Sequence, residues 1–157
     1  MVYLITGKIN SGKTTKMLDL YRQLNKGDGF ISVKTMKEND VYKYDLMRLS
    51  TAESKVLAYK APHFQMQFHS SVSLGDYYFN DSAFLWAEEE IDKMINNHIA
   101  PVFLDEIGLL EIQGQGFCKT IKKLLEASHL CYFTVRDVFI ERFIEKYEIT
   151  EYEIIAE

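Results

Sequence analysis

The sequence predicts an α/β fold in which a mostly parallel sheet is covered by helices on both faces. Strand-like segments alternate along the chain with helical segments of ten or more residues, which is the pattern of parallel strands joined by helical crossovers. Residues 102–104 are apolar at consecutive positions, as expected for a strand that is buried on both sides. The chain has 157 residues, no internal repeat and no low-complexity tract, so residues 1–157 are expected to form one domain.

The first half of the chain contains two strands, a helix and an insertion. Residues 2–6 form a short β-branched run that is followed at once by a glycine-containing turn, and residues 17–24 carry apolar side chains at helical spacing. Glycines then end the helix, and residues 29–34 predict a second strand. Residues 41–80, including the alternating segment 64–68, predict a small antiparallel β insertion.

The second half of the chain continues the alternation. Asp81 or Ser82 can cap a long helix that ends before Pro101. The segments that follow are a strand at 102–106, a helix at 116–128, a strand at 129–136, a helix at 137–147 and a last strand at 151–156.

Composition excludes several classes of protein. The formal charge is −5, and nucleic-acid binding needs a concentrated basic surface, so no nucleic acid is expected as a partner. The longest apolar run is five residues, far below the roughly 20 that cross a bilayer, so no membrane span is expected. The amino terminus has no export signal, which predicts a cytoplasmic protein. Two cysteines are too few for a disulfide framework.

Residues 7–14 match the pattern G-x-x-x-x-G-K-[S/T] at every fixed position. The match lies between a buried strand and an amphipathic helix, where free N–H groups and the helix dipole favour an anion. Gly12 lets the backbone approach phosphates, Lys13 can bridge β- and γ-phosphate oxygens, and the Thr14 hydroxyl can bind Mg²⁺. The expected nucleotide-binding residues are Gly7, Lys8, Ile9, Asn10, Ser11, Gly12, Lys13, Thr14 and Thr15.

A pair of carboxylates follows the buried strand at residues 102–104. Asp105 and Glu106 lie at its carboxyl end, the edge of a parallel sheet where ligands bind. Asp105 is suited to hold Mg²⁺, and Glu106 to polarise an attacking water molecule. Adjacent residues of a strand point to opposite faces, so we expect one carboxylate to face the metal and the other the γ-phosphate.

These motifs together resemble a family of P-loop nucleoside triphosphatases whose animal members are called cancer-related nucleoside triphosphatases. The resemblance spans roughly residues 1–145 and rests on GKINSGKTT, GFISVK, residues 75–84 and above all DEIGLLE at 105–111. It implies a three-layer, RecA-like P-loop fold and Mg²⁺-dependent hydrolysis of nucleoside triphosphates with broad base preference. Gly7, Gly12, Lys13, Thr14 and Thr15 match the family's phosphate loop, and Asp105, Glu106, Gly108 and Glu111 match its acidic motif.

The cation that neutralises the transition state is open. The family often continues GF-x-T-x-E-x-R after its first helix, and residues 29–36 of this chain lack both the acid and the arginine; Lys34 or Lys37 could substitute for the arginine. Arg136 is the first choice, because the strand 129–136 should end beside Glu106, and Thr134 is a candidate γ-phosphate sensor. Lys8, reaching a partner's nucleotide, is a further alternative.

Three functions follow from these residues. The leading one is hydrolysis of nucleoside triphosphates by a monomer or weak dimer, with Lys13, Glu106 and Arg136 as catalytic residues and Thr14 and Asp105 as metal ligands. The alternatives are a kinase for a nucleoside, nucleotide or small metabolite, and a nucleotide-dependent switch with a partner surface at 41–80. Only four arginines are present, which favours hydrolysis over a kinase with an arginine-rich lid. Aromatic residues could stack on a base or belong to the core: Tyr42, Tyr44, Tyr77, Tyr78 and Phe79.

Overall fold

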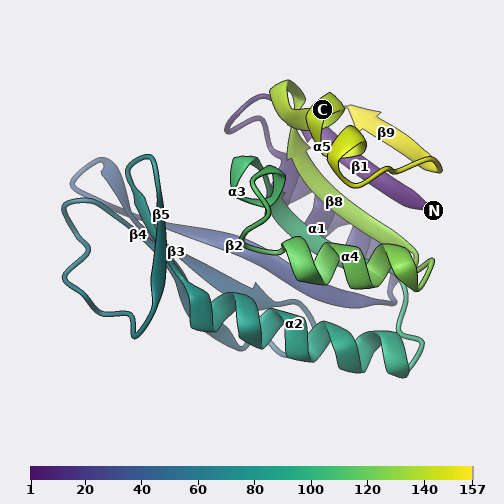
Figure 1. Ribbon diagram of the computed structural model, residues 1–157, viewed down its shortest axis with the longest axis horizontal. Coiled ribbons are helices and arrows are strands. Elements are labelled where there is room, and N and C mark those ends of the chain that lie inside the picture. Colours follow the sequence, from purple (N-terminus) through teal and green to yellow (C-terminus); the bar gives the residue numbers. More distant parts are fainter. Residues whose placement is uncertain (157) are drawn as a thin grey trace.

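The structure, a computed structural model, describes residues 1–156 and contains a nine-stranded mixed sheet with helices on both faces (Figure 1). The strands are β1 (Val2–Gly7), β2 (Asp28–Lys37), β3 (Asp40–Arg48), β4 (Ser54–Lys60), β5 (Ser71–Leu74), β6 (Tyr77–Asn80), β7 (Val102–Ile107), β8 (Cys131–Arg136) and β9 (Tyr152–Ala156). The helices are α1 (Lys13–Leu24), α2 (Asp81–Asn96), α3 (Leu109–Ile112), α4 (Cys118–Glu126), the 3₁₀ turn η1 (Asp137–Phe139) and α5 (Ile140–Lys146). The strand order is β5-β6-β4-β3-β2-β7-β8-β1-β9. The predicted α/β class is confirmed.

The parallel half of the sheet consists of β2, β7, β8, β1 and β9. Helix α1 lies behind this half, whereas α2, α4 and α5 lie in front (Figure 1). Met17 of α1 is fully buried in a cluster with Ile5, Ile31 and Phe103, so α1 is fixed against β1, β2 and β7. This packing sets the start of α1 directly above the carboxyl ends of β7 and β8.

The antiparallel half contains β3, β4, β6 and β5, and it confirms the antiparallel insertion predicted for residues 41–80. The strand predicted at 64–68 is wrong, because residues 61–70 form turns between β4 and β5. Met66 has a φ of 60°, which reverses the chain there. Phe64 and Phe68 have ring centroids 5.4 Å apart, whereas residues four apart on an extended strand would be separated by about 13 Å.

A partly buried ion network joins the two halves. The Arg48 guanidinium donates from Nε to Asp28 Oδ2 at 2.9 Å and from Nη1 to Glu90 Oε2 at 2.7 Å, which ties β2, β3 and α2 together. Asp28 is almost fully buried and also accepts hydrogen bonds from the backbone N–H and the hydroxyl of Ser50. Because a buried carboxylate needs all its partners, the loss of Arg48 would leave an uncompensated charge in this junction.

The structure differs from the sequence predictions at two helices, α2 and α3. Helix α2 is capped by Asn80, whose side chain accepts from the Ser82 N–H at 3.1 Å, rather than by Asp81 or Ser82. The four-residue helix α3 was not predicted, because it is too short to show periodicity. Within residues 1–156, no helix is long and apolar enough to cross a membrane.

Candidate active site

The loop between β1 and α1 has the conformation of an anion cradle. Asn10 and Gly12 have positive φ angles of 57° and 99°, and the Ser11 N–H donates to the Lys8 carbonyl at 3.2 Å. Gly12 adopts the left-handed conformation at the start of α1 without strain, because it has no Cβ. The first N–H groups of the twelve-residue α1 are therefore directed at the centre of the loop, where an anion gains from the helix dipole.

Two side chains of this loop carry polar groups that a bound anion would satisfy. The Lys13 ammonium is buried and donates to the Lys8 carbonyl at 2.7 Å, so it is held across the loop. The Ser11 hydroxyl is buried and, among the residues that the structure describes, has no hydrogen-bond partner. A phosphate oxygen would supply the missing partner of Ser11 and would replace the carbonyl at Lys13.

Asp105 lies at the centre of a hydrogen-bond network that spans four elements. Its Oδ2 accepts from the Thr14 hydroxyl at 2.8 Å and from the Ser32 N–H at 3.1 Å, and its Oδ1 accepts from the Thr134 hydroxyl at 2.5 Å. Asp105 is 1% exposed, and this burial raises the pKa of its carboxyl, while the three donors favour the charged form. The structure thus brings Thr14 and Asp105 together, although they are 91 residues apart.

The oxygens of Thr14 and Asp105 fit a magnesium ion. A hydroxyl and a carboxylate are hard donors, and Mg²⁺ is commonly held by one or two such protein groups with substrate phosphates and water. Across residues 1–156, no cluster of three or more His, Cys, Asp or Glu side chains forms an all-protein metal cage. A Mg²⁺ ion held by Thr14 and Asp105 would complete its coordination with phosphate oxygens and water.

Glu106 occupies a β-bulge, and this corrects the expectation that it simply alternates with Asp105. Two residues of β7, Asp105 and Glu106, lie opposite the single residue Thr134 of β8. Glu106 has a φ of 61°, a strained conformation for a residue other than glycine. The Thr134 hydroxyl accepts from the Glu106 N–H at 2.8 Å while it donates to Asp105, so one hydroxyl fixes both carboxylate residues.

Three cations surround Glu106. The Glu106 side chain is exposed, but the protein around its carboxyl displaces part of the surrounding water. This desolvation, followed by the charge of Asp105, raises the pKa of Glu106, and the positive charges of Lys13, Arg136 and Lys34 oppose this rise. Arg136 ends β8 and pairs in register with Gly7, the first residue of the loop. The Lys34 ammonium donates to Asn10 Oδ1 of the loop at 3.2 Å. The site therefore holds two of the sequence candidates for the transition-state cation.

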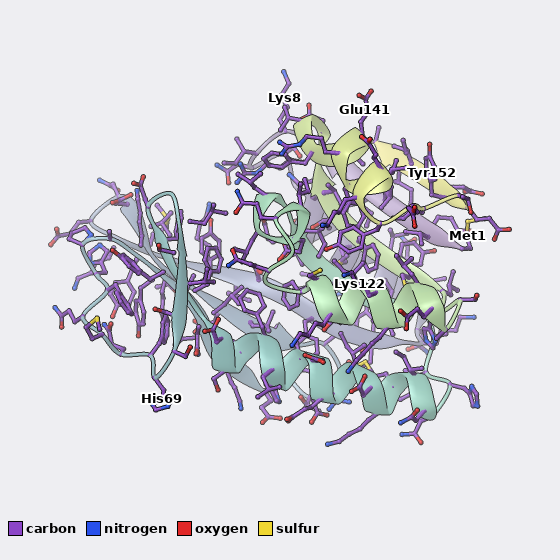
Figure 2. All side chains as sticks on the ribbon, in the orientation of Figure 1. Met1, Lys8, His69, Lys122, Glu141 and Tyr152 are labelled. Carbon is purple, nitrogen blue, oxygen red and sulfur yellow. The ribbon has the colours of Figure 1, made fainter. Side chains whose placement is uncertain are left out.

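The other residues predicted for the site have different surroundings. Thr134 is fully buried under the carboxylates, so its assignment as a γ-phosphate sensor is wrong, and it positions Asp105 and Glu106 instead. Lys8 points away from the molecule into solvent (Figure 2). The Lys37 ammonium lies 5.3 Å from the ring centroid of Tyr42, in the antiparallel half. Thr15 is exposed on the first turn of α1.

A cavity of about 420 Å³ opens beside Glu106 and Arg136, and the sequence did not predict it. Ile9 is the one residue of the loop 7–12 that lines it. Most of the wall comes from the antiparallel half and from the segment 106–117, and Ser32, Phe84, Arg136 and Phe139 complete it. The cavity could not be predicted from local patterns, because residues far apart in the sequence, from Ile9 to Phe139, form its wall. The one local indication of the cavity was that Tyr77 and Phe79, two residues apart on β6, place two aromatic rings on the same face of the strand.

Glu111 holds the segment that follows β7 under this cavity. Its carboxylate accepts from the N–H groups of Gly108 at 2.9 Å and Phe117 at 3.1 Å, and its carbonyl accepts from the Tyr147 hydroxyl at 2.7 Å. Burial raises the pKa of Glu111 to about 7, although the two N–H donors favour the charged form and lower the pKa. Gly116 has a φ of 62°, and a Cβ there would lie 2.0 Å from Glu111 Oε2, so only glycine fits.

The phosphate cradle, the Thr14–Asp105 pair and the adjacent carboxylate define a P-loop nucleotide-binding protein. The family model for the NTPase family matches residues 2–157, and the chain belongs to this family. No curated protein sequence is significantly similar to this chain.

Two solved structures share the fold. The crystal structure of THEP1 from the hyperthermophile Aquifex aeolicus superposes with a TM-score of 0.74 at 17% identity, covering 99% of this chain and 89% of THEP1. The solution structure of a human cancer-related nucleoside triphosphatase gives a TM-score of 0.67 at 17% identity, with 98% and 87% of the two chains covered. The resemblance drawn from the sequence motifs is thereby confirmed.

Proposed function

We propose that this protein hydrolyses nucleoside 5′-triphosphates to diphosphate and phosphate, with Mg²⁺ as cofactor and broad base preference. The observation that supports this most is the placement of Glu106 at a strained bulge, beside the cations of Lys13 and Arg136 and next to the Thr14–Asp105 pair. Strain at such a position is maintained only where the surrounding structure fixes it, which the Thr134 hydroxyl does here.

Each residue has a distinct role in the proposed reaction. The loop 7–15 binds the triphosphate, and Lys13 contacts β- and γ-phosphate oxygens. Glu106 orients a water molecule whose oxygen bonds to the γ-phosphorus, and it accepts the proton as the bond to the β–γ bridging oxygen breaks. Arg136 stabilises the charge that develops on the transferred group. Thr14 and Asp105 would hold Mg²⁺, which neutralises phosphate charge when bound.

The decisive experiment measures phosphate release from ATP, GTP, CTP and UTP with Mg²⁺ or EDTA. Glu106→Gln preserves the shape of the side chain and removes its charge, so kcat is expected to fall about 10²- to 10⁴-fold with little change in nucleotide affinity. Glu141→Gln, on the exposed side of α5, is the matched control and should leave kcat unchanged. Unchanged turnover in Glu106→Gln would refute the assignment, and tight binding without turnover in the unaltered protein would favour a switch.

A further inference from the structure

The cavity beside Glu106 differs in chemistry from the phosphate loop. Its wall is largely apolar and includes Leu57, Leu74, Phe79, Phe84, Leu110 and Phe117. Its volume of about 420 Å³ is in the range of sites for small organic ligands. A triphosphate would not bind in such a cavity, because its charged oxygens would lose their hydration without gaining hydrogen-bond partners.

The cavity meets the phosphate site at one end. Glu106 and Arg136 line it there, as does Ser32, whose hydroxyl is buried and unpartnered among the described residues. The same Ser32 donates its backbone N–H to Asp105, so this hydroxyl is fixed next to the reaction centre. A polar end with an apolar remainder is the arrangement that orients an amphiphilic molecule.

Neither water nor the nucleotide accounts for this cavity. A hydrolytic water molecule occupies about 30 Å³ and needs polar partners, which most of the wall lacks. The cavity touches the phosphate loop at Ile9 alone and opens at Glu106, where the proposed mechanism places the attacking group on the γ-phosphate. The position is therefore that of a molecule which takes the place of the attacking water.

We propose that the cavity binds a small alcohol with an apolar body and that the protein transfers the γ-phosphoryl group to its hydroxyl. This inference rests on the nucleotide site of the proposed function and names a second substrate class for it. The alcohol oxygen forms a bond with the γ-phosphorus, the bond from that phosphorus to the β–γ bridging oxygen breaks, and the nucleoside diphosphate leaves with the electron pair. The hydroxyl proton passes to the Glu106 carboxylate.

The test uses the whole protein with Mg²⁺·ATP and methanol, propan-1-ol, hexan-1-ol or benzyl alcohol at equal concentrations. Phosphorus-31 NMR measures the ratio of alkyl phosphate to inorganic phosphate. Burial of one methylene group favours binding about fourfold, so hexan-1-ol should give a ratio at least about tenfold above that of methanol. Inorganic phosphate alone with every alcohol, or a ratio independent of chain length, would overturn the proposal.

A variant that fills the cavity distinguishes the contribution of the cavity from that of the phosphate site. Leu74 lines the cavity from β5 and is half-buried, and Leu74→Trp should lower the alkyl phosphate ratio for hexan-1-ol at least about tenfold. Val72→Trp is the matched control, because Val72 lies on the same face of β5, is equally half-buried and does not line the cavity. Phosphate release to water should change less than about threefold in both variants.

The outcomes distinguish this inference from the proposed hydrolase. Phosphate release without alkyl phosphate supports the hydrolase and overturns the alcohol site. Alkyl phosphate without release to water supports the alcohol site and overturns the hydrolase. Absence of both products contradicts both, and an equal loss of alkyl phosphate in Leu74→Trp and Val72→Trp contradicts the placement of the site. Circular dichroism confirms that each variant is folded, and the chain-length series does not depend on any variant.

Discussion

The two halves of the sheet contribute different chemistry to one site. The parallel half ends in polar groups that bond one another, with Asp105 contacted by Thr14, Ser32 and Thr134. The antiparallel half instead contributes apolar side chains, such as Leu57, Leu74 and Phe79, which form no hydrogen bonds and line the cavity. Short motifs therefore fix the reacting groups, whereas contacts between distant segments determine which molecules can reach those groups.

The largest effect is expected in the parallel half. Lys13→Ala removes the ammonium held across the phosphate loop, and kcat/KM for ATP should fall at least about 10³-fold, or about 4 kcal/mol. Lys16→Ala is the control, since Lys16 is exposed on α1, and it should alter kcat/KM less than about twofold. Steady-state phosphate release measures both. Comparable losses in the two variants would contradict a specific role for Lys13.

Sequence reasoning predicted the parallel half well, because its chemistry is local. The pattern at 7–14 and the acidic pair at 105–106 each lie within a few residues, and the structure brings Thr14 and Asp105 within hydrogen-bond distance. Strand periodicity cannot reveal a bulge, so the left-handed φ of Glu106 and the positioning role of Thr134 were missed. Mg²⁺, a cytoplasmic location and a monomeric or weakly dimeric state stay predictions.

The antiparallel half was predicted less well, because its contacts are not local. The alternation at 64–68 predicts a strand, but Met66 has a positive φ and the rings of Phe64 and Phe68 are paired, so the segment is a turn region. The cavity depends on the register of β6 against β4, which places Phe79 opposite Ala58. No pattern within one segment reports that register.

The second largest effect is expected on stability and concerns Glu111, whose carboxylate holds the segment 108–117 together. Its pKa is raised from 4.5 to about 7, so the folded protein binds a proton more tightly than the unfolded chain. The contribution of Glu111 to stability is fully present below about pH 4.5 and is lost as pH rises through about 7, roughly 3 kcal/mol in all. Urea unfolding between pH 4.5 and pH 8 measures it.

The control for Glu111 is a side chain that cannot titrate. Glu111→Gln keeps the length of the side chain, and the difference in unfolding free energy between the two proteins should shift in favour of Glu111→Gln as pH rises. Parallel pH dependences for the two proteins would show that Glu111 is not protonated in the folded state near neutral pH.

A smaller effect separates the two cations near Glu106. Arg136→Ala should lower kcat about 10- to 100-fold with less than about threefold change in nucleotide affinity, because it acts on charge that develops in the transition state. Lys34→Ala should lower kcat less than Arg136→Ala does, because the Lys34 ammonium is exposed and already donates a hydrogen bond to Asn10. Arg142→Ala, exposed on α5, is the control for loss of charge. A larger loss in Lys34→Ala than in Arg136→Ala would reverse the assignment.

The smallest effect is expected on the outer face of the antiparallel half. Tyr78 points away from the cavity that Tyr77 and Phe79 line, and it stacks on Phe64 with ring centroids 4.4 Å apart. Phe64→Ala should cost about 1 kcal/mol of stability through this pair and leave turnover of all four nucleotides within about twofold. Phe79→Ala enlarges the cavity from the inner face, and its effect should appear in the alcohol series instead. A tenfold loss of turnover for one nucleotide in Phe64→Ala would show that the outer rings stack on a base, which would place substrate recognition on both faces of β6.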